Sequence, residues 1–418
     1  MTPSGGKTVA LVDPLWIGHH PMYFTQFTAS FLRLGANVIG LCPEPDAARR
    51  DLQEALGSTD LTGRVHFHKL PAGGRSFFNG RFEGDPVRTF SRWKRAADTL
   101  ADAEALSGLK CDLVYFPYLD SYLRFLPFSI VPRMLLNRPW SGLYLRNHHH
   151  GETASPRKSL RLLAKGDAIL RSDLCRGVGV LDERFIPAME RHSGKSIVPY
   201  PDVTQDGLPE LPYPPADEIR DKARSRSIVG MIGLERRKGF LTLLRVAELA
   251  REQMLPFYFV CAGTISLGQF TPDEQDRIRS IARDIAAGEI DNLHFDPAAG
   301  RIPNESDYNA LFRSFDIAWA AYEGFQGSSG TLSKAALFEI PCVATAGECI
   351  GDRVERYHMG ITIREGNAAD ALAALSQLTS ASADLALHAI YRDAHSQQRL
   401  DRILEDLLTQ LPEGRSKC

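Results

Sequence analysis

Short apolar runs alternate with amphipathic stretches along the whole chain, and one proline-rich segment interrupts this alternation. In the first half, KTVALVDP is followed by PMYFTQFTASFLRLG, whose apolar side chains recur every three or four residues until Gly35. This pattern predicts a strand followed by a helix, and NVIGLCP predicts the next strand. Alternating strands and helices are typical of a parallel sheet covered by helices on both faces.

The proline-rich segment divides the chain into two parts. Residues 199–215 contain six prolines, a density that disfavours regular structure, and the alternation starts again afterwards at SIVGMIG. We therefore predict an N-terminal domain over residues 1–200, a linker over 201–222 and a C-terminal domain over 223–395. The last helix, at about 396–418, is long enough to pack back on the first domain. The predicted fold class is α/β, with two Rossmann-like, doubly wound domains.

The composition excludes several classes of protein. The 418 residues contain no apolar run that could span a bilayer, and the N-terminus lacks the form of a signal peptide. Seven scattered cysteines without a C-x-x-C pair favour reduced thiols over disulfides or a zinc site. A cytoplasmic location is therefore expected. Residues 1–200 carry a net charge of +7 and the remainder −9, which suggests a different partner for each half.

The positive charge of the first half is densest between Arg75 and Arg95, where basic residues alternate with phenylalanine and tryptophan. Three interpretations are open. The segment is a solvated loop that leads into a helix with core-facing aromatics, a contact with an anionic membrane surface or lipid-phosphate acceptor, or a site for single-stranded nucleic acid. The first is favoured, and nucleic acid is not expected as a partner. Peripheral contact with the inner face of the cell membrane stays an alternative.

A cluster of cations follows the first predicted strand of the second half. GLERRKGF places Arg236, Arg237 and Lys238 after SIVGMIG and before a helix. Cations at the end of a strand can neutralise a diphosphate leaving group. A solvated charge run is the alternative.

A second loop, EGFQGSSGT, follows the apolar run DIAWAAY. It carries Glu323 and then a small turn that leads into the helix TLSKAALFE; the turn consists of Ser328, Ser329, Gly330 and Thr331. Hydroxyls and free N–H groups at a helix start can bind a phosphate, assisted by the helix dipole. A plain N-cap by one hydroxyl is the alternative.

The first half offers two histidine-containing loops. DPLWIGHHPMY holds Gly18, His19 and His20 between a predicted strand and a helix, where a glycine allows close backbone approach to a ligand. An ordinary connection between strand and helix is the alternative. HHHG follows the predicted strand GLYLRN and starts at His148, and a histidine at a strand end can bond a substrate hydroxyl or reacting centre. A metal site at residues 148–150 is not expected, because neighbours on a strand point to opposite faces.

Together these segments resemble the retaining GT-B glycosyltransferases, in particular the large family 4 (glycosyl transferases group 1). The likeness is carried by the loop around Gly18, the histidine after the first-domain strand, the proline-rich linker, GLERRKG, IPNESDYNALFRSFDIAWAAYEGF and SSGTLSKAALFEIPCVAT. It implies a GT-B fold, in which two Rossmann-like domains face a central cleft. The loop with Gly18, His19 and His20 would then line the acceptor side of that cleft.

The resemblance also implies a donor, a nucleotide diphosphate sugar with UDP, GDP or ADP, bound mainly by the second domain. Lys238, with Arg237 or Arg236, would hold the diphosphate, and the SSGT turn would hold its other side. The base would meet the backbone of a short loop formed by Arg301, Ile302 and Pro303. No cofactor is implied, and no metal is needed if the cationic side chains replace the ion.

The catalytic roles follow from the same resemblance. Glu323 matches the glutamate that contacts the donor sugar, and His148 or His149 matches the histidine near the reacting carbon. One position departs from the family, because Lys334 stands where a second glutamate normally holds the ribose. It lies 11 residues after Glu323, three more than is usual, while Thr331 lies eight residues after it.

We therefore expect a retaining enzyme that transfers a hexose to a glycan or lipid-linked acceptor in cell-envelope polysaccharide or glycolipid synthesis. Three alternatives remain open. The first is an inverting GT-B transferase with Asp13, His19 or His20 as general base. The second is an epimerase that acts on the nucleotide sugar. The third is a catalytically degenerate protein that binds a nucleotide or glycan and serves as a scaffold.

Overall fold

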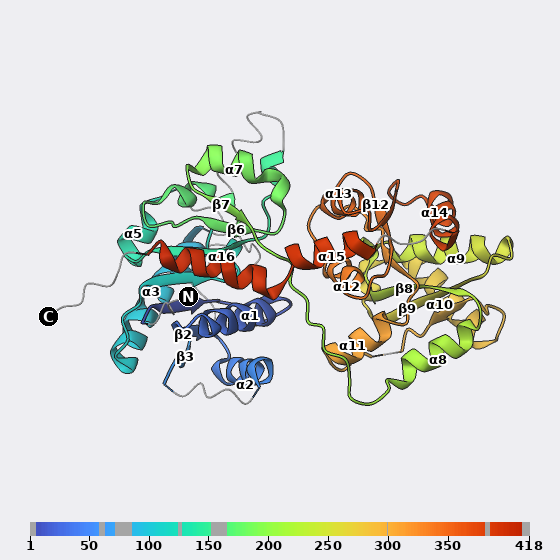
Figure 1. Cartoon of the computed structure of the whole chain (residues 1–418), viewed down its shortest axis with the longest axis horizontal. Helices are drawn as coiled ribbons and strands as arrows, with labels where there is room; N and C mark the ends of the chain where they lie inside the picture. Colours follow the sequence, from blue (N-terminus) through green and yellow to red (C-terminus); the bar gives the residue numbers. More distant parts are fainter. Residues whose placement is uncertain are drawn as a thin grey trace. The chain divides into compact units, whose positions relative to one another are not determined.

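The computed structural model describes residues 6–57, 63–71, 86–123, 128–151, 165–298, 300–380 and 385–411. They form two compact units, one of residues 1–201 and 397–418 and the other of residues 202–396. Each unit is built on a parallel sheet with helices packed around it (Figure 1). The predicted fold class, two doubly wound α/β domains, is confirmed.

The sheet of the first unit has the strand order β3-β2-β1-β4-β5-β6-β7, and every pair is parallel. Its strands are β1 (Thr8–Val12), β2 (Asn37–Cys42), β3 (Val65–Lys69), β4 (Leu113–Phe116), β5 (Trp140–Tyr144), β6 (Val178–Val180) and β7 (Ile197–Pro199). The helices around it are α1 (His20–Arg33), α2 (Pro45–Leu56), α3 (Pro86–Ser107), α4 (Asp120–Leu123), α5 (Val131–Leu135), α7 (Ile186–Ser193) and α16 (Gln397–Thr409). Short 3₁₀ turns are η1 (His148–Gly151), η2 (Asp167–Arg171) and η3 (Glu183–Phe185).

The sheet of the second unit has the order β10-β9-β8-β11-β12-β13, again all parallel. Its strands are β8 (Ser227–Leu234), β9 (Phe257–Ile265), β10 (Leu293–Phe295), β11 (Ile317–Ala320), β12 (Cys342–Thr345) and β13 (Gly360–Ile363). Its helices are α8 (Pro214–Ala223), α9 (Phe240–Glu252), α10 (Pro272–Ala286), α11 (Glu305–Phe312), α12 (Gly330–Leu337), α13 (Cys349–Arg356), α14 (Ala368–Ser380) and α15 (Leu385–Ala394), with the 3₁₀ turns η4 (Arg236–Lys238) and η5 (Leu267–Gln269).

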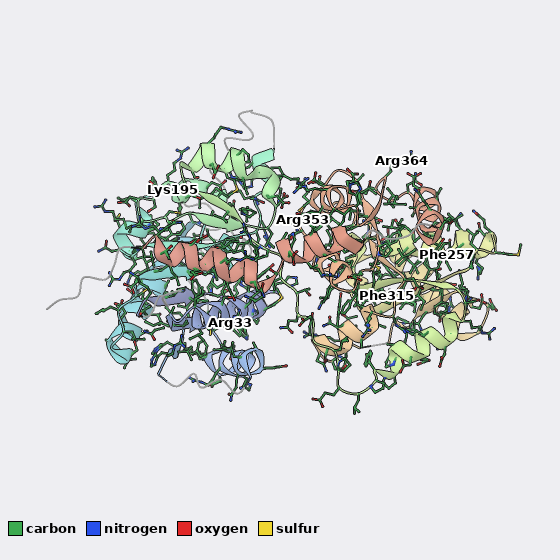
Figure 2. The ribbon with its side chains drawn as sticks, viewed as in Figure 1. Arg33, Lys195, Phe257, Phe315, Arg353 and Arg364 are labelled. Atoms are coloured by element: carbon green, nitrogen blue, oxygen red, sulfur yellow. The ribbon has the colours of Figure 1, made fainter. Side chains whose placement is uncertain are left out.

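Strand β8 shows why its sequence is a nearly continuous apolar run. Val229 and Met231 pack into one buried cluster that contains Phe257, while Ile228 and Ile232 pack into another that contains Phe315. Both phenylalanines are labelled in Figure 2. Because successive side chains of a strand point to opposite faces, a sheet covered on both faces needs an apolar residue at nearly every position.

The structure assigns part of the predicted linker to a helix. Residues 202–213 contain no helix or strand, but α8 begins at Pro214, where two prolines occupy its first turn. A proline in the first turn costs the helix no hydrogen bond, so prolines that disfavour the middle of a helix are tolerated at its start. The irregular segment is therefore shorter than the predicted 201–222.

The last helix belongs to the first unit. Arg33 of α1, labelled in Figure 2, donates to both carboxylate oxygens of Asp401 on α16, and Gln397 donates to Ser30 at 2.7 Å. The buried face of α16 consists of leucines and one isoleucine, namely Leu400, Ile403, Leu404, Leu407 and Leu408. The chain therefore returns to the first unit at its end.

The basic and aromatic segment is only partly described, because Arg75 and the rest of residues 72–85 lie outside the described residues. Farther along, Trp93 is fully buried in the core of the first unit and donates to Tyr122 O at 2.7 Å. Arg92 donates to Ser121 O and Arg95 to Pro71 O. Trp93 therefore faces the core, as the first interpretation expects, whereas Phe90 of the same helix is 40% exposed. No helix in the described ranges is long and apolar enough to cross a bilayer.

Candidate functional site

The second sheet has its topological switch point between β8 and β11. The chain runs outward from β8 through β9 to β10 and then returns to the other side of β8 at β11. Ligands of doubly wound proteins bind outside the carboxyl ends of the strands at such a point. The two loops that flank this switch point are the predicted ones, Glu235–Gly239 after β8 and Tyr322–Ser329 after β11.

A glycine shapes the first of these loops. Gly239 has φ +74°, and a Cβ at this position would lie 2.2 Å from Ala321 O, so no other residue fits without a backbone shift. Directly before it, Lys238 Nζ donates to Ile232 O near the end of β8 at 3.1 Å, and Lys238 O accepts the indole N–H of Trp319 at 3.1 Å. The loop after β8 is therefore tied to both central strands.

The two arginines of this loop are about half exposed and have carboxylate partners. Arg236 pairs with Glu274 at 3.0 Å, and Arg237 donates to Glu235 at 2.5 Å. The guanidinium of Arg237 also lies 5.2 Å from the centre of the Phe325 ring. With Lys238, these side chains put three cations at the carboxyl end of β8, as the sequence predicts.

Glu323 links the two loops. Its backbone N–H donates to Arg237 O at 2.8 Å, and its Oε1 accepts the hydroxyl of Thr242 at 2.5 Å. The next residue is also fixed, because Gly324 N donates to Glu365 at 3.0 Å. The structure therefore brings together two motifs that are more than 80 residues apart in the sequence.

The SSGT turn begins helix α12, and the hydroxyls of Ser329 and Thr331 have partners within the protein. Ser329 is the N-cap, and its Oγ accepts from Thr331 N at 3.2 Å. The phenol of Tyr322 lies 2.8 Å from Ser329 Oγ and 3.1 Å from Thr331 Oγ1. Ser329 is therefore the plain helix N-cap that the sequence predicts as the alternative for this turn. Ser328 and Gly330 complete the turn at the same sheet edge.

The loop predicted to meet the base lies farther along this edge. Arg301, Ile302 and Pro303 follow β10 and precede α11, which is capped by Asn304. Ile302 packs against the same apolar cluster as Tyr322. The loop therefore shares a layer of packing with the SSGT turn.

Lys334 has a structural role at the position that departs from the family pattern. It is 4% exposed, and its Nζ binds Asn309 Oδ1, Gln205 O at 2.7 Å and Glu305 Oε1 at 2.5 Å. Asn309 in turn donates to the backbone of Gln205 and Gly207. Lys334 therefore holds the segment before α8 against α11 and α12. Because its ammonium group is occupied by these three contacts, Lys334 offers no hydrogen-bond donor to a ligand.

The first sheet has its switch point between β1 and β4, and a buried Asp–His pair lies there. Asp13, the first residue after β1, is fully buried, and His20 Nδ1 lies 2.8 and 2.9 Å from its two oxygens. The imidazole stacks on Tyr118, which follows β4, with ring centres 4.0 Å apart. Burial raises the pKa of Asp13, although the hydrogen bond from His20 opposes the rise.

Gly18 and His19 are the other two predicted residues of the loop between β1 and α1. Gly18 has φ +60°, which a glycine adopts without strain, and both it and His19 are exposed. Of the two histidines, His20 is therefore the buried one. Among the described residues, no group forms a hydrogen bond with His20 Nε2.

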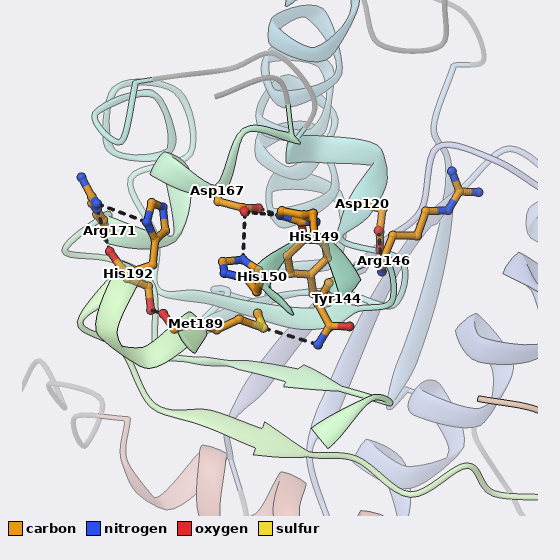
Figure 3. A network of polar contacts seen from close by, with 11 residues as sticks. Asp120, Tyr144, Arg146, His149, His150, Asp167, Arg171, Met189 and His192 are labelled. Carbon is orange, nitrogen blue, oxygen red and sulfur yellow. Dashed lines mark hydrogen bonds and ion pairs between the residues drawn. The ribbon is translucent and has the colours of Figure 1, made fainter. Parts of the chain in front are cut away.

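His148, His149 and His150 do not continue a strand; the last two are labelled in Figure 3. Strand β5 ends at Tyr144, because Leu145 N and Arg146 N donate to the carboxylate of Asp120 instead of to a neighbouring strand. The three histidines form the turn η1. The argument from strand alternation is therefore wrong for these residues.

Two of these histidines converge on one carboxylate. His149 Nε2 lies 2.6 Å and His150 Nε2 2.9 Å from Asp167 Oδ2, and Tyr144 donates to Asp167 Oδ1 at 2.7 Å (Figure 3). All three side chains of the His–His–Asp group are buried. Burial alone would raise the pKa of Asp167, but the hydrogen bonds from His149 and His150 hold it well below its usual range.

The His–His–Asp group has the ligand types of a zinc site, with ligand atoms within 4.8 Å of one another. Zinc with bonds of about 2.0–2.1 Å to nitrogen and oxygen would hold these atoms roughly 3.3 Å apart. The observed 2.6 and 2.9 Å are instead the distances of direct contacts between side chains. His149, at 1% exposure, is committed to Asp167, whereas His148 is half-buried.

Four residues of these sites are not predicted by the sequence motifs, namely Thr242, Tyr322, Tyr118 and Asp167. Tyr322 directly precedes the EGFQGSSGT motif, whereas Thr242, Tyr118 and Asp167 are single residues without a motif around them. Thr242 could be recognised from the sequence pattern, because it is a lone hydroxyl on the apolar face of a helix. The other three become recognisable only when distant segments are brought together.

No protein-family model and no curated protein sequence matches the chain. Its fold, however, is similar to solved structures over nearly the whole length. One is HepE from Anabaena in complex with UDP, with a TM-score of 0.65, 13% identity and coverage of 97% of this chain and 100% of that one. HepE has also been solved with UDP-glucose.

Two synthases are similar to the same extent. Sucrose-phosphate synthase from Thermosynechococcus elongatus has a TM-score of 0.61 at 14% identity, with 97% of this chain and 98% of that chain covered. A UDP-forming α,α-trehalose-phosphate synthase from Burkholderia xenovorans has a TM-score of 0.61 at 14% identity, with 97% and 99% covered. At these identities the likeness shows the fold, which is the two-domain α/β fold of GT-B glycosyltransferases.

Proposed function

We propose that the protein is a glycosyltransferase that moves a hexose from a nucleotide diphosphate sugar to a glycan or lipid-linked acceptor of the cell envelope. One observation carries the proposal. The hydrogen bond from Glu323 N to Arg237 O joins the two loops at the switch point of the second sheet. It places cations, a carboxylate and a helix start at one edge, which is the set of groups that a sugar diphosphate requires.

Each part of the donor then has a partner. Lys238 and Arg237 neutralise the diphosphate as negative charge develops on it, and the start of α12 at Gly330 and Thr331 offers backbone N–H groups to its other side. Glu323 accepts hydroxyls of the hexose. The base lies against the loop at Arg301–Pro303. Because cationic side chains supply the positive charge, the proposed reaction needs no metal.

A panel of donors tests this proposal. A ligand that binds only the folded state raises the melting temperature, by an amount that grows with its concentration relative to Kd. We expect one of UDP-, GDP- or ADP-sugars to do so and to be consumed in the presence of an acceptor, with EDTA leaving the rate unchanged. Consumption without an acceptor would indicate an epimerase. Binding without any turnover would indicate a scaffold, and the absence of both would refute the proposal.

Two stereochemical courses are compatible with this donor site. The family resemblance favours retention, with the leaving phosphate helping to take the acceptor proton, and this is the course we propose first. Inversion is the second candidate, because the Asp13–His20 pair is the arrangement that a general base requires. Asp13 holds Nδ1, so Nε2 could accept the proton of an acceptor hydroxyl.

The anomeric configuration of the product decides between these courses. Under retention, NMR shows the anomer of the donor, and His20→Gln lowers kcat/KM by less than about tenfold. Under inversion, NMR shows the opposite anomer, and His20→Gln lowers kcat/KM by about 10²- to 10⁴-fold, the usual contribution of general base catalysis. Asp13 is avoided as the test position because removing a fully buried carboxylate would also affect folding.

A further inference from the structure

Helix α9 has a single polar side chain on its buried face, Thr242. The buried residues of this helix are Phe240, Thr242, Leu243, Leu244, Val246, Ala247 and Ala250. Thr242 lies in the first turn of α9, and the carbonyl four residues before it, the common acceptor of a threonine hydroxyl in a helix, is Lys238 O, outside α9. That carbonyl instead accepts the indole N–H of Trp319, and the Thr242 hydroxyl reaches out of its own helix to Glu323.

The contact between Thr242 and Glu323 is well defined chemically. An ionised carboxylate only accepts hydrogen bonds, so the hydroxyl is the donor. The distance of 2.5 Å is that of a bond from a hydroxyl to a charged oxygen. Only Oε1 of Glu323 is engaged in this way, and no described residue donates to Oε2. One carboxylate oxygen is therefore fixed by the protein while the other remains for a ligand.

We propose that Thr242 is a positioning residue, which holds the Glu323 carboxylate so that Oε2 accepts a hydroxyl of the donor hexose. This inference rests on the proposed function and deepens it. The backbone of Glu323 is fixed by Arg237 O, but its side chain has three rotatable bonds that the backbone does not restrain. The bond from Thr242 orders this side chain before the donor arrives, so ordering costs less when the sugar binds.

Replacing Thr242 by valine tests the inference, because valine keeps the shape and removes the hydroxyl. Hydrogen bonds to charged groups are worth enough that losing this one is expected to lower kcat/KM by about 10- to 100-fold. Thr242→Ser keeps the hydroxyl and is expected to stay within a few-fold of the wild type. The rates are measured with the donor from the panel of UDP-, GDP- and ADP-sugars, together with the melting temperature of each variant.

A matched control comes from the first unit. Thr28 of α1 is fully buried and donates to Phe24 O at 2.7 Å, the ordinary bond of a helical threonine. Thr28→Val removes a buried hydroxyl outside the proposed site and is expected to leave kcat/KM unchanged. A merely structural role of Thr242 would instead lower the melting temperature and leave kcat/KM per folded molecule intact.

A double substitution tests whether the effect of Thr242 on catalysis acts through Glu323. In a Glu323→Ala background, Thr242→Val is expected to change neither donor binding nor rate further. Wild-type rates in Thr242→Val, or an equal loss in both backgrounds, would overturn the inference and leave the proposed function standing. If the wild type neither binds nor turns over any donor of the panel, the proposed function fails and this inference fails with it.

Discussion

Replacing Lys238 by methionine is expected to lower the rate of hexose transfer by about 10²- to 10³-fold, the usual cost of removing one group that stabilises developing charge. Methionine keeps most of the aliphatic stem and removes the cation. The side chain contributes one hydrogen bond to the fold, to Ile232 O. Its loss is expected to cost about 1 kcal/mol, so the variant stays folded.

A lysine elsewhere in the same unit serves as the control. Lys222 on α8 is half-exposed and pairs with Glu218 at 2.6 Å, one turn away on the same helix. Exposed pairs of this kind contribute little to stability, so Lys222→Met is expected to leave both transfer and folding unchanged. Full turnover by Lys238→Met, or by Lys238→Ala, would refute the role assigned to this cation. Donor binding by the folded variants shows whether the charge acts on binding or on the chemical step.

The two loops at the switch point of the second sheet are largely predictable from the sequence. GLERRKG and EGFQGSSGT each follow an apolar strand and precede a helix, and parallel strands place such loops at one edge of the sheet. The alternation of strands and helices fixes the fold class for the same reason. Both inferences need only local patterns and one general rule of topology.

Contacts between distant side chains could not be predicted in this way. No local pattern indicates that Thr242 bonds Glu323 or that Lys334 binds Asn309. The first pair is brought together by the packing of α9 against the loop after β11, and the second by the packing of α12 against α11. The histidines at 148–150 show a further limit. A carboxylate elsewhere in the chain, Asp120, takes the N–H groups that would have continued the strand. The strand therefore ends early, and His149 and His150 are buried against Asp167.

The second large effect is expected at Asp167. Replacing it by asparagine is expected to lower the stability of the first unit by about 3–5 kcal/mol, which corresponds to a fall of roughly 6–20 °C in melting temperature. The carboxylate accepts Tyr144 on one oxygen and contacts His149 and His150 on the other. An amide group offers one oxygen in place of two, so buried donors lose their acceptor and cannot reach water.

An exposed aspartate of the same unit provides the comparison. Asp173 pairs with Arg133 at 2.8 Å, and both side chains are more than half exposed. Asp173→Asn is expected to change stability by less than about 1 kcal/mol. If both substitutions lower the stability by the same small amount, the His–His–Asp group contributes no more to stability than an exposed ion pair.

The pH dependence of the free energy of unfolding tests whether the charged form of Asp167 stabilises the folded protein. Its pKa in the folded protein lies below the unfolded value of about 3.9, so the unfolded state binds the proton more readily. The stabilisation is therefore fully present above pH 5 and is lost as the pH falls through and below 4. Denaturation of the wild type and of Asp167→Asn, compared from pH 5 to pH 3, is expected to show a difference in stability that narrows as the pH falls. A difference that instead grows on acidification would mean that burial outweighs the two histidines and raises the pKa of Asp167.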